Sequence, residues 1–188
     1  MTKLKIIIFF LLLINTLFAQ AQIYIGSSYG ILEEKFTNEI DAEASTNIAK
    51  IKLGYGVREA YAVELSLEYI DNQAKIFSSD PKVDSDGDKY GINVDVIKAF
   101  DLNQFALPYI KAGFGSGWFE VQRKFQNRLF YSSFNLSTGI LIPFDKNIDF
   151  ELGYEYKYIS YESIDTIADK INYESNANIA YFGFIVRF

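Results

Sequence analysis

The sequence predicts an all-β protein: one closed, antiparallel, up-and-down transmembrane β-barrel of eight strands. Three observations predict this fold. Apolar and polar residues alternate with a period of two, the connections between alternating segments are short and long in turn, and glycine concentrates on the charged face. Although 49% of the 188 residues are apolar, the mean hydropathy is only +0.03, so the apolar residues are dispersed rather than gathered in helical spans.

The first segment has the pattern of a secretory signal peptide. Lys3 and Lys5 precede an unbroken apolar run over residues 6–14. Ala19 and Ala21 then form the small-x-small pattern that signal peptidase recognises. The alternative, a helical membrane anchor, is disfavoured because the run is shorter than the ~20 residues that a spanning helix needs.

Two units are therefore expected, a cleaved signal peptide at 1–21 and an outer-membrane β-barrel domain at 22–188. Removal of Lys3 and Lys5 takes away two positive charges and changes the net charge from −6 to −8. Such an acidic protein is a poor nucleic-acid binder. The absence of Cys excludes disulfides, lipid attachment at Cys and thiolate metal sites.

Eight segments after the signal peptide show the alternation of a strand. It is clearest at 61–70 and 148–159, where every second residue is apolar and its neighbours are mostly charged. Each segment is about as long as the roughly 9–11 residues that a tilted strand needs to cross a membrane. The segments lie at 23–31, 48–57, 61–70, 89–99, 105–116, 129–142, 148–159 and 177–188.

The connections between these segments alternate in length. Tight turns are predicted at 58–60, 101–104 and 143–147, whereas the connections after the first, third and seventh segments have about sixteen to eighteen residues and that after the fifth is shorter. Short turns at one end and long loops at the other are typical of transmembrane barrels. An even number of strands then places both termini at the short-turn, periplasmic end.

Glycine decides which face is predicted to point outward. A soluble barrel such as a lipocalin would turn the charged face to water, but glycine has poor strand propensity and gains nothing there. The narrow interior of an eight-stranded barrel, in contrast, needs small residues. Ten of the 12 glycines share the charged face, so the bulky face is predicted to contact lipid: Gly26, Gly30, Gly54, Gly56, Gly91, Gly113, Gly115, Gly139, Gly153 and Gly183.

The end of the chain carries the most specific pattern. Phe182, Phe184, Val186 and Phe188 form an apolar stripe that alternates with inward positions such as Arg187. A final strand that ends on an exposed Phe is unusual in a soluble protein. The stripe resembles the terminal signature that the outer-membrane assembly machinery recognises.

With segments 106–115, 150–156 and 183–188, this ending resembles the OmpA/OmpX-like outer-membrane β-barrel proteins. The resemblance covers the mature chain and implies an outer-membrane location, contact with outer-membrane lipid, assembly by that machinery, and surface ligands bound through the loops. Two-domain members continue into a peptidoglycan-binding domain, which we do not expect here because the sequence stops at this strand.

The charges on the inner face are expected to form a network that fills the lumen, because an unpaired buried charge is strongly unfavourable. A turn centred near Glu59 places Lys50 opposite Glu68 and Lys52 near Glu64 and Glu68, and the next tight turn brings Asp95 close to Tyr109 or Lys111. The alternative is a set of pore-lining charges, disfavoured because eight strands leave no aqueous channel. The predicted network comprises Lys50, Lys52, Glu64, Glu68, Asp95, Lys111, Glu151, Glu155 and Arg187.

Two long connections have features of their own. Residues 84–88 repeat carboxylates as a Ca²⁺ loop does, but Lys89 replaces the glycine that should follow and the twelfth position, Asp95, belongs to a strand, so we interpret the segment as a solvated acidic loop. The segment 120–128 is net positive, contains Val121 and Phe125, and follows Trp118 and Phe119. It either extends its strands above the membrane, which we favour, or contacts lipid headgroups or a partner.

The predicted function is that of a structural or surface-interaction protein with displayed loops, serving envelope integrity, adhesion or resistance. The alternatives are a narrow pore or a transporter of small hydrophobic molecules and, further away, a soluble periplasmic binding protein. Enzymatic activity is not expected, because the known chemistries of outer-membrane barrels use a histidine base and this chain has no His. No catalytic, metal or cofactor site is predicted.

Overall fold

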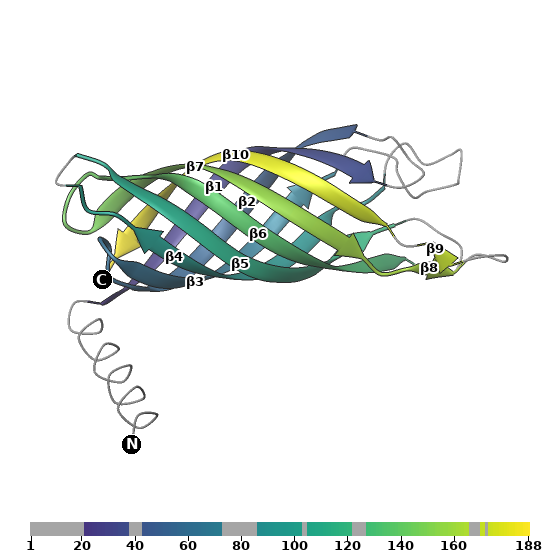
Figure 1. The fold of residues 1–188 in the computed structure, drawn as a ribbon, viewed down its shortest axis with the longest axis horizontal. Helices are drawn as coiled ribbons and strands as arrows, with labels where there is room; N and C mark the ends of the chain where they lie inside the picture. Colours follow the sequence, from purple (N-terminus) through teal and green to yellow (C-terminus); the bar gives the residue numbers. More distant parts are fainter. Residues whose placement is uncertain are drawn as a thin grey trace, which may run out of the picture.

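The structure, a computed structural model, describes residues 21–37, 43–72, 86–102, 105–121, 127–165, 170–171 and 173–188, which form ten strands (Figure 1). Eight long strands build the barrel wall: β1 (Gln22–Thr37), β2 (Glu43–Gly56), β3 (Tyr61–Asp71), β4 (Lys89–Ala99), β5 (Leu107–Glu120), β6 (Arg128–Pro143), β7 (Ile148–Tyr161) and β10 (Glu174–Arg187). Two short strands, β8 (Ile164–Asp165) and β9 (Lys170–Ile171), form a separate ribbon. Within the described ranges, no helix is long and apolar enough to span a bilayer.

The wall is closed. Each long strand pairs antiparallel with its neighbour in the chain, and β1 pairs with β10 to complete the circle. The strands run obliquely around the axis, and the C-terminus lies at the same end as the start of β1 (Figure 1). Closure leaves no unpaired edge, which matters because hydrocarbon offers no partner to a free backbone N–H or C=O. The predicted eight-stranded, up-and-down barrel is confirmed.

The strands are longer than predicted at the long-loop end. β1 continues to Thr37 and β10 begins at Glu174, beyond the predicted limits at residues 31 and 177. Near these ends the apolar residues move from the outer face to the inner face. Leu32 and Phe36 are buried inside, whereas Glu33 is exposed outside. The prediction stopped where the apolar residues left the outer face, but a strand that leaves the bilayer needs a polar exterior and a packed interior. The β8–β9 ribbon was also not predicted.

The hairpin of β5 and β6 shows the same extension. Glu120 is paired with Arg128, and both Phe119 and Leu129 are fully buried inside the barrel. The predicted extension of the strands is confirmed as far as Glu120 and Arg128. Residues 122–126 lie outside the described ranges.

The outer face along the middle of the barrel is apolar. Ile51, Leu67 and Phe114 are 65%, 56% and 70% exposed, whereas Lys50, Glu68 and Lys111 on the same strands are buried. Such a surface is unfavourable in water but suits acyl chains. The predicted assignment of the bulky face to the exterior is confirmed, and the lipocalin-like alternative is wrong.

Inside the barrel, glycine makes room for tyrosine. Four inward tyrosine residues each lie directly opposite a glycine of the neighbouring strand, and the ring covers the position where a Cβ would stand. The pairs are Tyr24 with Gly54, Tyr109 with Gly139, Tyr131 with Gly117 and Tyr181 with Gly153. Three of the ten glycines that predicted the inner face, Gly54, Gly139 and Gly153, therefore make room for a large ring, and Gly117, which was not in that set, does the same.

The lumen has three layers. An apolar cluster that includes Leu32, Ile48 and Phe119 fills the long-loop end, and a second that includes Ile97, Leu141 and Ile185 fills the short-turn end. Charged side chains occupy the layer between them. The apolar clusters were not predicted, because the alternation indicates a polar inner face along the whole barrel.

Candidate functional site in the lumen

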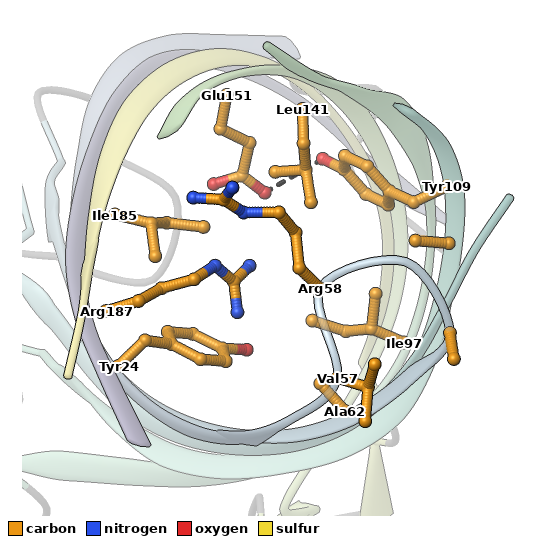
Figure 2. Close-up of a pocket in the computed structure, with 12 residues that line it drawn as sticks. Tyr24, Val57, Arg58, Ala62, Ile97, Tyr109, Leu141, Glu151, Ile185 and Arg187 are labelled. Carbon is orange, nitrogen blue, oxygen red and sulfur yellow. Dashed lines mark hydrogen bonds between the residues drawn. The ribbon is translucent and has the colours of Figure 1, made fainter. Parts of the chain in front are cut away.

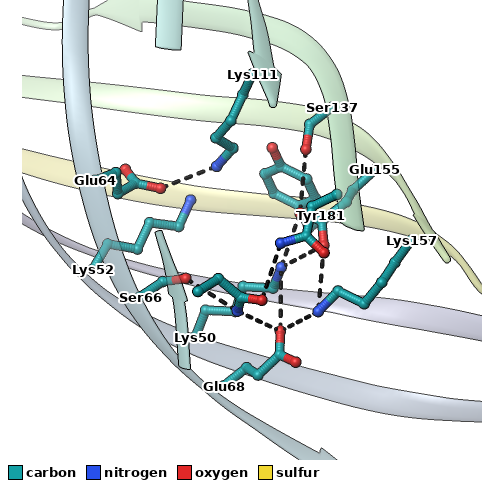
Figure 3. Close-up of polar contacts among 12 residues, drawn as sticks. Lys50, Lys52, Glu64, Ser66, Glu68, Lys111, Ser137, Glu155, Lys157 and Tyr181 are labelled. Atoms are coloured by element: carbon teal, nitrogen blue, oxygen red, sulfur yellow. Dashed lines mark hydrogen bonds and ion pairs between the residues drawn. The ribbon is translucent and has the colours of Figure 1, made fainter. Parts of the chain in front are cut away.

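The middle layer of the lumen is the most chemically distinctive part of the molecule. Its side chains project inward from alternate positions of β2, β3, β5 and β7 and meet near the barrel axis (Figure 3). Of the nine residues predicted for the network, all are buried. Within the described residues, eight of these nine form ion pairs, and the exception is Asp95.

Glu68 is the hub of this layer. Lys157 Nζ lies 2.5 Å from Glu68 Oε2, and Lys50 Nζ lies 3.7 Å from the same oxygen. Asn93 and Tyr131 donate further hydrogen bonds to its carboxylate at 3.0 and 3.3 Å. With donors on both oxygens, a carboxylate that is 4% exposed is satisfied without water.

Glu155 links the same lysines from the opposite wall. Lys50 Nζ lies 2.8 Å from Glu155 Oε1, Lys157 Nζ lies 3.7 Å away, and the Ser137 hydroxyl donates to Oε2 at 3.2 Å. Two lysines and two glutamates therefore alternate around a closed loop. Each charge has two opposite charges as neighbours, which offsets much of the cost of desolvating it.

Two further pairs lie toward the short-turn end. Lys111 Nζ lies 3.0 Å from Glu64 Oε1, and the Tyr24 hydroxyl donates to the other oxygen at 2.9 Å. Lys52 Nζ lies 2.5 Å from Glu151, which also accepts a hydrogen bond from Tyr109 at 2.9 Å.

The register explains which predicted contacts form. Lys50 stands opposite Glu68, as the turn position predicted. Lys52 stands opposite Ser66, but its ion partner is Glu151 on β7 rather than a glutamate of β3. The register thus places Lys52 between Glu64 and Glu68 as predicted, but in a narrow closed barrel a long side chain reaches the far wall as easily as its neighbour, and Lys52 forms its ion pair there.

The prediction for Asp95 was wrong by two to four residues of register. Asp95 stands opposite Gly113, not Tyr109 or Lys111. The connection between β4 and β5 runs over residues 100–106 and is longer than the four-residue turn that was assumed, which shifts the pairing. Within the described residues, no cation lies within ion-pair distance of Asp95.

Five ion-paired residues were missing from the predicted network. Lys157 and Asp149 follow the same alternation as Glu151 and Glu155, so the period of the strand was signal enough to include them. Arg58 belongs to a turn, Glu34 lies beyond the predicted end of the first strand, and Lys89 is the first residue of the predicted segment 89–99, directly after the acidic loop. Lys89 is in fact buried, is paired with Glu34, and faces the rings of Phe36, Phe119 and Tyr161.

Other predicted positions can be placed only in part. Ala19 of the signal sequence, Asp84 and Ser85 lie outside the described residues, and Ala21 is the first described residue. Over the described ranges, no group of three or more His, Cys, Asp or Glu side chains is arranged to hold a metal ion. On β10, Phe182, Phe184 and Phe188 are 60%, 50% and 69% exposed on the outer wall, and Val186 on the same face is half-buried.

A family model for the outer membrane protein beta-barrel domain matches residues 7–188. The chain belongs to this family. Membership indicates the outer membrane as its location, in agreement with the apolar outer wall and the closed sheet. No curated protein sequence gives a significant match.

Solved structures share the fold at low sequence identity. Neisserial surface protein A is 18% identical, with a TM-score of 0.66, and the match covers 89% of this chain and 99% of that one. The outer membrane protein AlkL in lipid bilayers is 10% identical, with a TM-score of 0.58 and coverage of 90% of both chains. Ail of Yersinia pestis, in complex with the heparin analogue sucrose octasulfate, is 15% identical, with a TM-score of 0.52 and coverage of 88% and 99%.

Proposed function

We propose that this protein is a structural and surface-interaction protein of the outer membrane, in which the barrel is an anchor and the long-loop end contacts a partner. The observation that carries the proposal is the obstructed lumen. The Lys50–Glu155 pair crosses from β2 to β7, and apolar clusters fill the lumen on both sides of this layer. A solute would have to break buried ion pairs to pass, which argues against a conducting role.

The long-loop end presents a polar surface outside the apolar belt. Its strands continue beyond the apolar belt with polar residues outside, such as Glu33 and Asn176. Three of the four long connections carry more acidic than basic residues; residues 32–47, for example, hold five acids and one Lys. These charges favour a cationic partner over a sulfated one such as the sucrose octasulfate bound by Ail.

Planar-bilayer conductance tests the obstructed lumen. The purified, refolded protein is expected to give no stepwise current under conditions in which a general porin conducts. Regular current steps would contradict the anchor proposal and favour the narrow pore. Uptake of a small hydrophobic dye into vesicles that contain the barrel, above that of empty vesicles, would instead favour the hydrophobic-molecule transporter.

Binding of fluorescent oligolysine to intact cells tests the displayed surface. Cells that express the protein are expected to bind more oligolysine than cells that express the double variant Glu33→Gln/Glu162→Gln. The matched control, Glu59→Gln/Asp101→Asn, removes the same charge at the short-turn end and should bind like the parent. Equal binding by all three would contradict a cationic partner at the loops.

We also propose that residues 1–21 are removed on export and that the stripe of Phe182, Phe184, Val186 and Phe188 is the signal for assembly. The first expectation is tested by the mass of the protein from purified outer membranes. For the second, Phe188→Ser should lower the amount of folded barrel in cells without changing refolding of the purified protein in detergent. A parallel loss in both settings would indicate a folding defect instead.

A further inference from the structure

A single lysine stands on the outer wall at the short-turn edge of the apolar belt. Lys98 lies directly opposite Tyr61 of β3 on one side and Ile110 of β5 on the other. Ala62 and Ile97, the sequence neighbours of this pair, point into the barrel (Figure 2), so Tyr61 and Lys98 point outward. On the described strands, Lys98 is the one charged side chain that faces outward at this edge.

Two aromatic rings flank the Lys98 ammonium group. Its Nζ atom lies 4.2 Å from the centroid of the Tyr61 ring and 5.7 Å from that of Phe100. The backbone N–H of Phe100 donates to the Pro108 carbonyl at 2.8 Å, which holds the start of the turn beside the lysine. Both rings are exposed on the outer wall. A cation between aromatic rings is typical of the boundary between acyl chains and headgroups.

Lys98 differs from the inward-facing cations that contact aromatic rings. Lys52, Lys89, Lys111 and Arg187 each have a carboxylate within ion-pair distance as well as a ring. Among the residues that the structure describes, no carboxylate lies so close to Lys98. Aromatic faces stabilise a cation but leave its charge in place. The Lys98 ammonium is therefore open to an anion from the surroundings of the barrel.

We propose that Lys98 binds the phosphate of an anionic phospholipid in the periplasmic leaflet. Short turns mark the periplasmic end of such barrels, and the anion beside the wall at this edge is the phosphate of a headgroup. Toward the middle of the barrel, the wall continues with the exposed pair Val63 and Val96, against which the acyl chains lie. An anionic lipid is favoured over phosphatidylcholine, because the choline group brings a cation of its own.

Native mass spectrometry tests the site, with the barrel released into mild detergent from vesicles of phosphatidylglycerol and phosphatidylcholine. The parent is expected to retain phosphatidylglycerol about fivefold above its share of the vesicle, the preference that one lysine near an anionic surface provides. Lys98→Gln should lose this preference and Lys98→Arg should keep it. The matched control, Lys146→Gln, removes a lysine from an exposed turn at the same end and should behave like the parent.

Two further arms separate the parts of the site. Tyr61→Leu keeps the lysine and an apolar side chain but removes one ring, and should lower the preference by about twofold or more. Each variant should show the heat-modifiable migration of the folded parent, and Tyr61→Leu carries the test if Lys98→Gln does not fold. Glycerol phosphate, which has the phosphate without acyl chains, should not displace the retained lipid.

Three results would overturn the proposal. Equal retention of phosphatidylglycerol by the parent and Lys98→Gln would mean that the lysine binds no lipid. An equal loss in Lys146→Gln would mean that total charge decides retention and that the position of the lysine does not. Displacement by glycerol phosphate would mean that the site takes any phosphate and that the apolar wall selects nothing.

Discussion

Two groups of buried polar side chains in the middle of the lumen are satisfied to different degrees. Lys50 of β2, Glu68 of β3 and Lys157 of β7 each have two ion partners. Asp95 of β4, in contrast, has an oxygen that makes no hydrogen bond to any described residue. The same is true of one atom each of Ser133 and Asn135.

The strand register explains this difference. Asp95 stands directly opposite Glu64, a like charge, and its other neighbour is Gly113, which has no side chain. Lys111, which was predicted to lie close to Asp95, forms its ion pair with Glu64 instead. In the described part of the middle layer, four lysines, Lys50, Lys52, Lys111 and Lys157, face five carboxylates, Glu64, Glu68, Asp95, Glu151 and Glu155.

A buried charge is thus stabilised by partners across the lumen, and the neighbouring strand alone does not provide them. Glu68 and Asp95 are both buried carboxylates on adjacent strands, yet only Glu68 lies where lysines from two other walls converge. The two residues should therefore respond in opposite ways to neutralisation.

The largest effect is expected for Glu68→Ala. This change leaves Lys157 and Lys50 without their shared carboxylate in a dry interior, and should lower the free energy of unfolding by about 3–5 kcal/mol. Urea unfolding in lipid vesicles, followed by the fluorescence of the single tryptophan, Trp118, measures it. The control is Glu162→Ala at an exposed loop carboxylate, for which a change within about 0.5 kcal/mol is expected. Similar small losses for both would mean that the network contributes little.

An intermediate effect is expected for Gly54→Ala, which tests the packing of the Tyr24 ring beside Glu64. A Cβ at residue 54 would stand 2.0 Å from the Tyr24 ring, so the ring must move from its hydrogen bond to Glu64, at a cost of about 1–3 kcal/mol. In the background Tyr24→Ser, the same glycine substitution should cost much less, and a double-mutant cycle measures the coupling. Additive losses would show that the contact does not matter.

The smallest effect is expected for Asp95→Asn. Because Asp95 has no ion partner and faces Glu64, loss of its charge should leave the free energy of unfolding unchanged or raise it by up to about 1 kcal/mol. Glu64→Gln, on the neighbouring strand, removes the partner of Lys111 and should destabilise the barrel in the same assay. A loss of more than about 1 kcal/mol for Asp95→Asn would contradict the contrast between Glu68 and Asp95.

Much of the fold follows from local patterns. The two-residue period places Glu64 inside and Leu65 outside, and the tight turn after β2 sets Lys50 opposite Glu68. The glycines indicate the inner face correctly, although the sequence does not reveal that Gly54 accommodates Tyr24. The strand ends at the long-loop side were missed because the prediction assumed that apolar residues stay on the outer face. Leu32 and Phe36 point inward in the part of β1 that lies between the apolar belt and the long loops.

The sequence by itself determined which side chains point into the barrel, because alternation is a property of each strand and needs no knowledge of its neighbours. Only the tertiary structure decided which of them meet. Closure of the sheet brings Lys52 to Glu151 and Lys50 to Glu155 across about a hundred residues of sequence. Which side chains meet depends on the register of every strand between them. One turn of the wrong predicted length, as for Asp95, changes the partner.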